Sequence, residues 1–181
     1  GFVGASPDGS HVYFVASGPL VPGKGRTLEQ NTTDETFSLY GEKNGEVSFV
    51  GTIGLGDLRS VTAGAINYGL AWTSGVSPDG RYLLFQSKDN VTGYDSGGAP
   101  EAYLYDARGG SEGTICVSCR QDGLPSVAGD SYAVLASPED TSNGGGVIDH
   151  AHPPQNLTMR DGRPQVLFTS PDRLASGAVE G

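Results

Sequence analysis

The sequence is short of basic residues and of long apolar runs, and each shortage excludes a class of function. Eleven Lys and Arg stand against 21 Asp and Glu, which makes the formal net charge −10. A chain this acidic repels phosphate backbones, and no basic cluster offsets the repulsion, so we expect no nucleic-acid partner. No apolar run approaches the roughly 20 residues that cross a bilayer, so we expect no membrane span.

The sequence also lacks stretches that could form long helices. Its 29 glycines and 11 prolines interrupt nearly every segment. Only residues 26–40 and 81–92 run for a dozen or more positions without either residue, and neither stretch has apolar residues at helical spacing. With glycine included, about half of the residues are apolar, which is ordinary for a globular domain. These features favour a folded all-β protein with little or no helix.

Histidine is scarce, and the three that occur indicate no catalytic site. His11, His150 and His152 have no partners that the sequence identifies as a triad. Asp149, His150 and His152 could present a carboxylate and two imidazoles to a metal, but the glycines before them and the prolines after them favour a solvated loop. No dinucleotide-binding fingerprint is present. We therefore expect no catalytic, cofactor-binding or metal-binding residues, and a protein that is not an enzyme.

A turn followed by an apolar run occurs three times along the chain. Residues 6–9 and 77–80 both read Ser-Pro-Asp-Gly, and residues 160–162 read Arg-Asp-Gly. In such a turn Pro presets φ, Asp hydrogen-bonds to nearby backbone N–H groups and Gly accepts a positive φ, so we expect these residues to be structural. The repeated turn residues are Pro7, Asp8, Gly9, Pro78, Asp79, Gly80, Asp161 and Gly162.

The apolar runs after these turns predict three equivalent strands that are buried on both faces. They span residues 12–17, 82–87 and 165–170 and place Phe14, Phe85 and Phe168 at matching positions. Each unit continues as a meander of four antiparallel strands, which is typical of a propeller blade. The other strands are expected at 37–40, 46–50, 102–106 and 114–118, with a short strand before each turn that is clearest at 70–76.

The turn-plus-strand pattern resembles the WD-like β-propeller repeats of the TolB type. Residues 90–95, 101–106 and 116–119 look like those of large secreted actinobacterial propellers of unassigned function. The resemblance implies an exported bacterial protein, extracellular or at the cell surface, with a non-catalytic binding or scaffold role. Similar repeats form the propeller domains of prolyl-oligopeptidase-like enzymes, so a hydrolase whose catalytic domain lies outside this chain is the alternative.

The expected strands make up about two and a half blades, whereas closed propellers typically have four to eight. Blade 1 covers about 1–54, blade 2 about 68–120, and the start of blade 3 about 131–181. An incomplete ring leaves the faces of its end blades uncovered. We therefore expect a piece of a longer chain, with the remainder of the propeller or other protein chains as partners. A homo-oligomer, in which a structural subunit assembles with itself, is the other interpretation.

Cysteine is almost absent, and its two copies, Cys116 and Cys119, lie three residues apart. A zinc site needs about four ligands and no second pair exists, while thioredoxin-like chemistry expects a βαβ context that is missing here. Residues three apart in a strand are separated by about 10 Å, which is beyond the reach of a disulfide. A bridge therefore requires the strand to end at this point. The pair is a candidate disulfide, with buried free thiols and a metal or redox pair as the alternatives.

Overall fold

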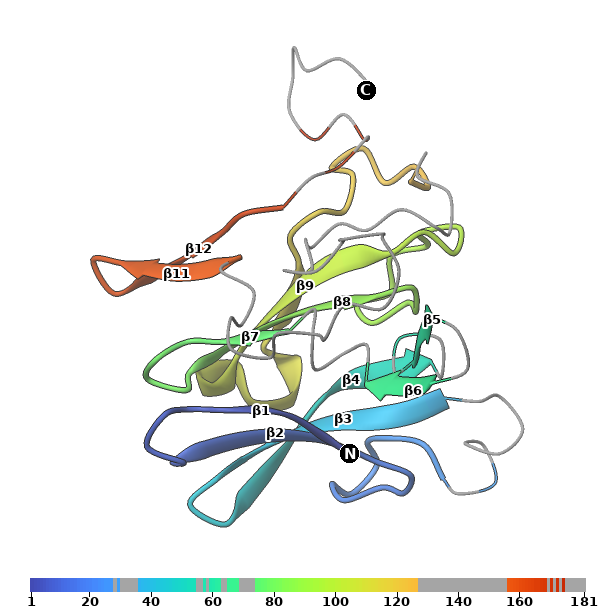
Figure 1. Ribbon diagram of the computed structural model, residues 1–181. Coiled ribbons are helices and arrows are strands. Elements are labelled where there is room, and N and C mark those ends of the chain that lie inside the picture. The colour runs from blue at the N-terminus through green and yellow to red at the C-terminus, as the bar shows by residue number, and fades with distance from the viewer. Residues whose placement is uncertain are drawn as a thin grey trace.

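The computed structural model describes residues 1–27, 29, 36–54, 57, 59–62, 65–68, 74–126, 156–168, 170, 172 and 174. Among them are two four-stranded antiparallel sheets, and in each the strands are neighbours in chain order (Figure 1). The first sheet consists of β1 (Phe2–Ala5), β2 (His11–Ala16), β3 (Thr36–Lys43) and β4 (Glu46–Gly54). The second sheet consists of β7 (Gly75–Val76), β8 (Tyr82–Ser87), β9 (Glu101–Asp106) and β10 (Thr114–Cys116).

Two hairpins and a short helix are the other described elements. β5 (Arg59–Thr62) pairs with β6 (Ala65–Tyr68), and β11 (Leu157–Arg160) pairs with β12 (Arg163–Val166). The 3-10 helix η1 (Ala107–Glu112) lies between β9 and β10. The all-β fold class is therefore confirmed. Within the described residues no helix has the length and apolar character to cross a membrane.

The two Ser-Pro-Asp-Gly turns fold in the same way and begin β2 and β8. The carboxylate of Asp8 accepts from Ser6 Oγ at 2.6 Å and from the backbone N–H of Ser10 at 3.0 Å. Asp79 accepts equivalent bonds from Ser77 Oγ at 2.6 Å and from the N–H of Arg81 at 3.1 Å. These bonds favour the charged form, and they lower the pKa of Asp8 to about 2.

The third turn has a different geometry. Asp161 and Gly162 form the two-residue link between β11 and β12, and both have a positive φ, of 51° and 72°. A pair of positive φ values matches the twist of a tight hairpin. Pairing therefore starts at Arg163, directly after the turn, and β11 offers partners only as far as Leu157, opposite Val166. The prediction of a strand at 165–170 is wrong in its limits, because β12 ends at Val166.

The two sheets stack face to face (Figure 1), and their first strands, β1 and β7, contact each other. Near β1 and β7, Ser74 Oγ donates to the carbonyl of Val3 at 3.4 Å. Near β4 and β10, Thr114 Oγ1 donates to the carbonyl of Val50 at 2.7 Å. The second strands are also joined: the hydroxyl of Tyr13 in β2 donates to the carbonyl of Gly80, in the turn before β8, at 2.7 Å. The second sheet thus repeats the first along the chain and lies on it in the same orientation.

The main core fills the space between these sheets. Phe85 of β8 is fully buried there and stacks on Tyr103 of β9, with ring centroids 5.5 Å apart. Tyr13 meets Tyr105 edge to face across the interface, with centroids 6.0 Å apart. The buried members of this core are Val3, Tyr13, Val15, Leu39, Val50, Ile53, Leu83, Phe85, Tyr103 and Tyr105.

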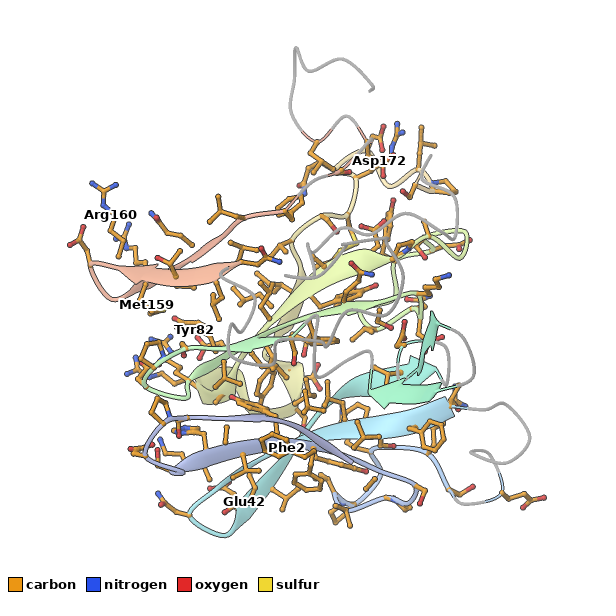
Figure 2. The ribbon with its side chains drawn as sticks, in the orientation of Figure 1. Phe2, Glu42, Tyr82, Met159, Arg160 and Asp172 are labelled. Carbon is orange, nitrogen blue, oxygen red and sulfur yellow. A yellow bond between two sulfur atoms is a disulfide. The ribbon has the colours of Figure 1, made fainter. Side chains whose placement is uncertain are left out.

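A second, smaller core lies on the opposite face of the second sheet. Tyr82, Leu84, Ala102 and Leu104 alternate with the residues of the main core and contact the β11–β12 hairpin. Figure 2 shows Met159 of this hairpin near Tyr82, and Phe168, beyond the end of β12, packs in the same cluster. As expected, β8 is buried on both of its faces.

The first sheet is covered less completely. Along β2, buried residues alternate with half-buried ones, so the expected burial on both faces is wrong for this strand. Phe14 lies opposite Tyr40 of β3, as Phe85 lies opposite Tyr103, but it points away from the second sheet and is only half-buried. Residues 18–27 cover part of this face, where the N–H of Leu20 donates to the hydroxyl of Tyr40 at 3.0 Å.

Candidate functional site

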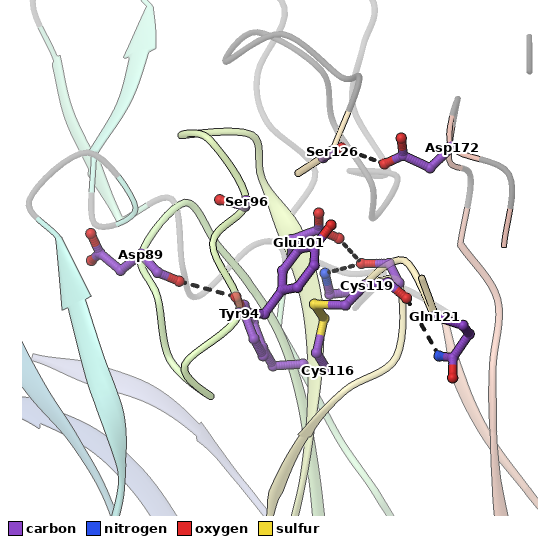
Figure 3. Close-up of a disulfide and its surroundings, with 12 residues drawn as sticks. Asp89, Tyr94, Ser96, Glu101, Cys116, Cys119, Gln121, Ser126 and Asp172 are labelled. Atoms are coloured by element: carbon purple, nitrogen blue, oxygen red, sulfur yellow. Dashed lines mark hydrogen bonds between the residues drawn. A yellow bond between two sulfur atoms is a disulfide. The ribbon is translucent and has the colours of Figure 1, made fainter. Parts of the chain in front are cut away.

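A disulfide lies at the end of β10, the last strand of the second sheet (Figure 3). The strand stops at Cys116, and the chain bends so that the Cα atoms of Cys116 and Cys119 are 5.6 Å apart. The N–H of Val117 still pairs with the carbonyl of Ala102, at 2.9 Å. The strand prediction to residue 118 is therefore too long, because the disulfide requires this bend. Cys116 is half-buried, whereas Cys119 is 8% exposed.

Glu101, the first residue of β9, lies against the disulfide. A carboxyl oxygen of Glu101 and the two sulfur atoms all lie within 4.8 Å of one another. Glu101 is only 2% exposed. Its Oε2 accepts a hydrogen bond from Ser118 Oγ, but its Oε1 is buried without a hydrogen-bond partner. Buried polar atoms are nearly always paired, so an unpaired carboxyl oxygen beside a disulfide indicates a role beyond packing.

The surroundings of Glu101 favour its protonated form. Burial raises the pKa of its carboxyl, the hydrogen bond from Ser118 opposes the rise, and the negative charge of Asp172 adds to it. Asp172 is itself held by Arg120, whose Nη1 lies 3.7 Å from its Oδ1, and by a hydrogen bond from Ser126 Oγ. While the two sulfur atoms are bonded to each other, they provide no thiolate for a metal. The group can, however, move a proton next to a disulfide.

A second pair of partly buried acids lies where β4 and β8 end. Asp57 accepts hydrogen bonds from Ser87 Oγ at 2.6 Å and from the N–H of Lys88 at 3.0 Å. Burial and the charge of Asp57 raise the pKa of Asp89 to about 6, although Arg26 opposes the rise. Asp89 Oδ2 has no hydrogen-bond partner. Two carboxylates are far from the six to eight oxygen ligands of a calcium site, so we assign this pair no ligand.

A pocket of about 210 Å³ opens between the sheets, close to the Ser-Pro-Asp-Gly turns. Tyr13 and Tyr105 line it together with the charged side chains of Glu42, Lys43 and Arg108. Sites for whole small molecules typically measure about 300–1,000 Å³. This pocket can take a group of a few atoms but is too small for an ordinary cofactor.

Three residues of the first turn have the composition of a catalytic triad but not its geometry. Ser10 Oγ lies 3.1 Å from His11 Nδ1, and it donates to Asp8 at 2.8 Å. In a triad the acid orients the imidazole, whereas here it binds the serine. His11 is 6% exposed and packs against Gly80 of the second turn. Burial, followed by the charge of Lys43, lowers its pKa.

Two motif matches that sequence reasoning missed lie in the same region. Residues 109–113 match Gly-x-Ser-x-Gly, but they are in η1 and its cap, and Ser111 Oγ accepts from the N–H of Phe49 at 3.3 Å instead of pairing with an imidazole. Residues 18–24 match Gly-x-x-x-x-Gly-Lys, but Gly25 replaces the Ser or Thr that a phosphate-binding loop requires. Lys24 instead pairs with Glu112 at 2.8 Å. Neither match has the structural context of its motif.

The remaining sequence candidates divide between described and undescribed parts of the chain. The eight repeated turn residues form turns, as set out above. Asp149, His150 and His152 lie outside the described residues. Sequence reasoning did not single out Glu101 or Asp89, because an acid at the beginning or end of a strand usually faces solvent.

The comparisons with known proteins give no neighbour from which a function could be transferred. No protein-family model, no curated protein and no solved structure matches the chain.

Proposed function

We propose that this chain is part of a WD-like β-propeller of the TolB type and serves as a non-catalytic binding or scaffold module of an exported bacterial protein. The proposal is supported by two four-stranded meanders that stack in the same orientation, each with an equivalent turn before its second strand. A disulfide fits an oxidising compartment outside the cytoplasm. The strongly acidic composition argues against nucleic acid as the bound partner.

The observation that best supports a binding role is the outer face of the first sheet, which is the face turned away from the second sheet. Its apolar residues include Phe2, which is 63% exposed, and the half-buried Phe14 and Phe49. At the matching place in the second sheet, Leu83 and Phe85 are fully covered by the first sheet. An apolar face of this kind indicates a protein partner.

The partner that fits this face is another four-stranded sheet. Tyr13 and Val15 of the first sheet cover the face of the second sheet that contains Phe85. Another sheet with similar residues on its surface would cover Phe14 in the same way. Such a sheet belongs either to the remainder of the propeller or to another copy of the chain. The module then acts by stacking sheets and not by chemistry on a substrate.

The association state of the 181-residue chain tests this proposal. We expect a species heavier than the 18.7 kDa monomer in size-exclusion chromatography with light scattering. Phe14→Lys should shift it toward the monomer, because it places a charge on the outer face without entering the main core. Leu124→Lys is the matched control, since Leu124 is also exposed, at 56%, but lies in the loop after the disulfide. A monodisperse, cooperatively unfolding monomer would refute the proposal.

A further inference from the structure

The Cys116–Cys119 disulfide is poorly suited to be a structural staple. It closes a loop between residues only three positions apart, and the stabilisation from a disulfide grows with the length of the loop. The strand that it follows is already held to β9 by ladder pairs from Thr114 to Cys116. The disulfide therefore adds little to the stability of the fold, and we consider a chemical role for it instead.

Thiol–disulfide exchange requires an accessible sulfur atom and a proton donor, and this site contains both. One sulfur must be reachable by an attacking thiolate, and the half-buried Cys116 is more accessible than Cys119. The other sulfur must leave as a thiolate, which is costly in a buried position unless a proton is at hand. The carboxyl of Glu101, buried and with an unpaired oxygen, lies within 4.8 Å of both sulfur atoms.

We propose that Cys116–Cys119 is a redox-active disulfide that exchanges with external dithiols, and that Glu101 donates a proton to the leaving sulfur of Cys119 and removes it on reoxidation. The site does not depend on the propeller assignment, since Glu101 begins β9, Cys116 ends β10 and Cys119 lies in the bend that directly follows β10. It adds a redox-sensitive group to a module that we otherwise describe as non-catalytic.

The exchange is balanced as follows. A thiolate of the dithiol attacks Sγ of Cys116; a mixed disulfide forms, and the electron pair of the Cys116–Cys119 bond moves to Cys119 Sγ. That sulfur takes the proton of the Glu101 carboxyl. The second thiolate of the dithiol then attacks the sulfur of the dithiol that is bonded to Cys116. Cys116 leaves as a thiolate and takes a proton from water. Glu101 regains its proton from the two that the dithiol released. Two electrons and two protons pass to the protein, and the dithiol becomes a cyclic disulfide.

The groups around Glu101 set the pH range in which this transfer works. Asp172 faces it with a negative charge, the phenols of Tyr94 and Tyr103 lie close enough for their charges to couple with it, and Arg120 partly neutralises Asp172. Burial is the largest influence and raises the pKa of Glu101. The carboxyl therefore keeps its proton to a higher pH than an exposed glutamate would. The rate of reduction per attacking thiolate should therefore fall as the pH rises through that pKa.

The test is the rate at which dithiothreitol reduces the folded chain, followed by alkylation and mass spectrometry. Glu101→Gln keeps the size of the side chain but cannot donate a proton, and we expect reduction to be on the order of 10²-fold slower, which is the lower end of general acid–base catalysis. Glu112→Gln is the matched control, because the side chain of Glu112 is 83% exposed and does not belong to the cluster of Glu101 with the two sulfur atoms; its rate should equal that of the wild type. Glu101→Asp, which retains an acid on a shorter stem, should recover part of the rate.

The pH profile of the wild type provides a second readout that needs no variant. The rate divided by the concentration of dithiothreitol thiolate should fall as Glu101 loses its proton. A flat profile, or a Glu101→Gln protein that folds and is reduced at the wild-type rate, would overturn the role of Glu101. A disulfide that resists dithiothreitol until the chain is unfolded would overturn the redox-active site itself.

Discussion

The first and second sheets contain the same local structure in different surroundings. Phe14 and Phe85 follow the same turn and lie opposite Tyr40 and Tyr103, with ring centroids 5.9 and 5.5 Å apart. Phe85 is nevertheless fully buried between two sheets, whereas Phe14 is half-buried on the outer face. Turn and register therefore follow from the local sequence, while burial depends on what packs against each face.

Truncating the two phenylalanines should distinguish the two sheets most strongly. Phe85→Ala should lower the free energy of unfolding by about 3–5 kcal/mol, because it opens a cavity in the main core. Phe14→Ala should cost about 1 kcal/mol, since its ring is only half-buried. Urea unfolding at low protein concentration measures both losses. Equal losses would mean that a partner covers Phe14 in solution as completely as the first sheet covers Phe85.

The glycines of the two turns provide a matched pair with the next largest effect. Gly9 and Gly80 have φ of 71° and 70°, so alanine is strained at either position by about 1–2 kcal/mol. A Cβ on Gly9 would meet nothing within 4 Å, whereas a Cβ on Gly80 would lie 2.5 Å from His11 Nδ1. Gly80→Ala should therefore cost about 1–3 kcal/mol more than Gly9→Ala in thermal or urea unfolding. If the two losses are alike, His11 is not fixed between the sheets.

Only the second sheet contains a disulfide, and its removal should have a smaller effect. Because the closed loop is so short, the chain-entropy relation gives at most about 2 kcal/mol. Unfolding of the oxidised and reduced wild-type chain, with a Cys116→Ala/Cys119→Ala variant beside them, measures this difference. A loss as large as that of Phe85→Ala would show that the disulfide is a structural staple after all.

The smallest effect concerns the acids between the ends of β4 and β8. The pKa of Asp89 is raised from 3.8 to about 6, so the folded state binds its proton more tightly than the unfolded state does. The charged form therefore lowers stability progressively from about pH 4 to pH 6, and fully above that range. Asp89→Asn should raise stability by about 1 kcal/mol at pH 7, after allowance for solvent screening, and leave it almost unchanged at pH 4. A variant that is less stable at pH 7 would contradict this assignment.

The sequence was sufficient for the features that depend on neighbouring residues. Both Ser-Pro-Asp-Gly turns, the strands after them and the antiparallel order of each sheet follow from turn chemistry and from runs of β-branched and aromatic residues. The β5–β6 hairpin, at residues 59–62 and 65–68, was not foreseen, because its sequence has neither a clear alternation nor a strong turn signal. For Cys116 and Cys119 the spacing left several states open, and only the bend after β10 decides among them.

The candidate site was largely beyond prediction because its residues are distant in the sequence. Glu101, Ser118 and Asp172 come from three separate segments, and the pKa of Glu101 is set by burial that no local pattern encodes. The same is true of Asp57 and Asp89, whose coupling requires the ends of β4 and β8 to meet. The matches at 18–24 and 109–113 fail for the opposite reason: the letters are present, but the strand, turn and helix around them are not.

The contact between the two sheets joins two different surfaces. The first sheet contributes Tyr13 and Val15 from one face, and the second contributes Leu83 and Phe85 from the opposite kind of face. The interface is therefore heterologous: it joins unlike surfaces and cannot form a two-fold symmetric pair by repeating itself. Sheets added by the same contact must follow head to tail, and their stagger and twist decide whether the series closes into a ring or continues as an open filament. The direction in which such a series grows therefore follows from the difference between the two faces of a single strand, β2.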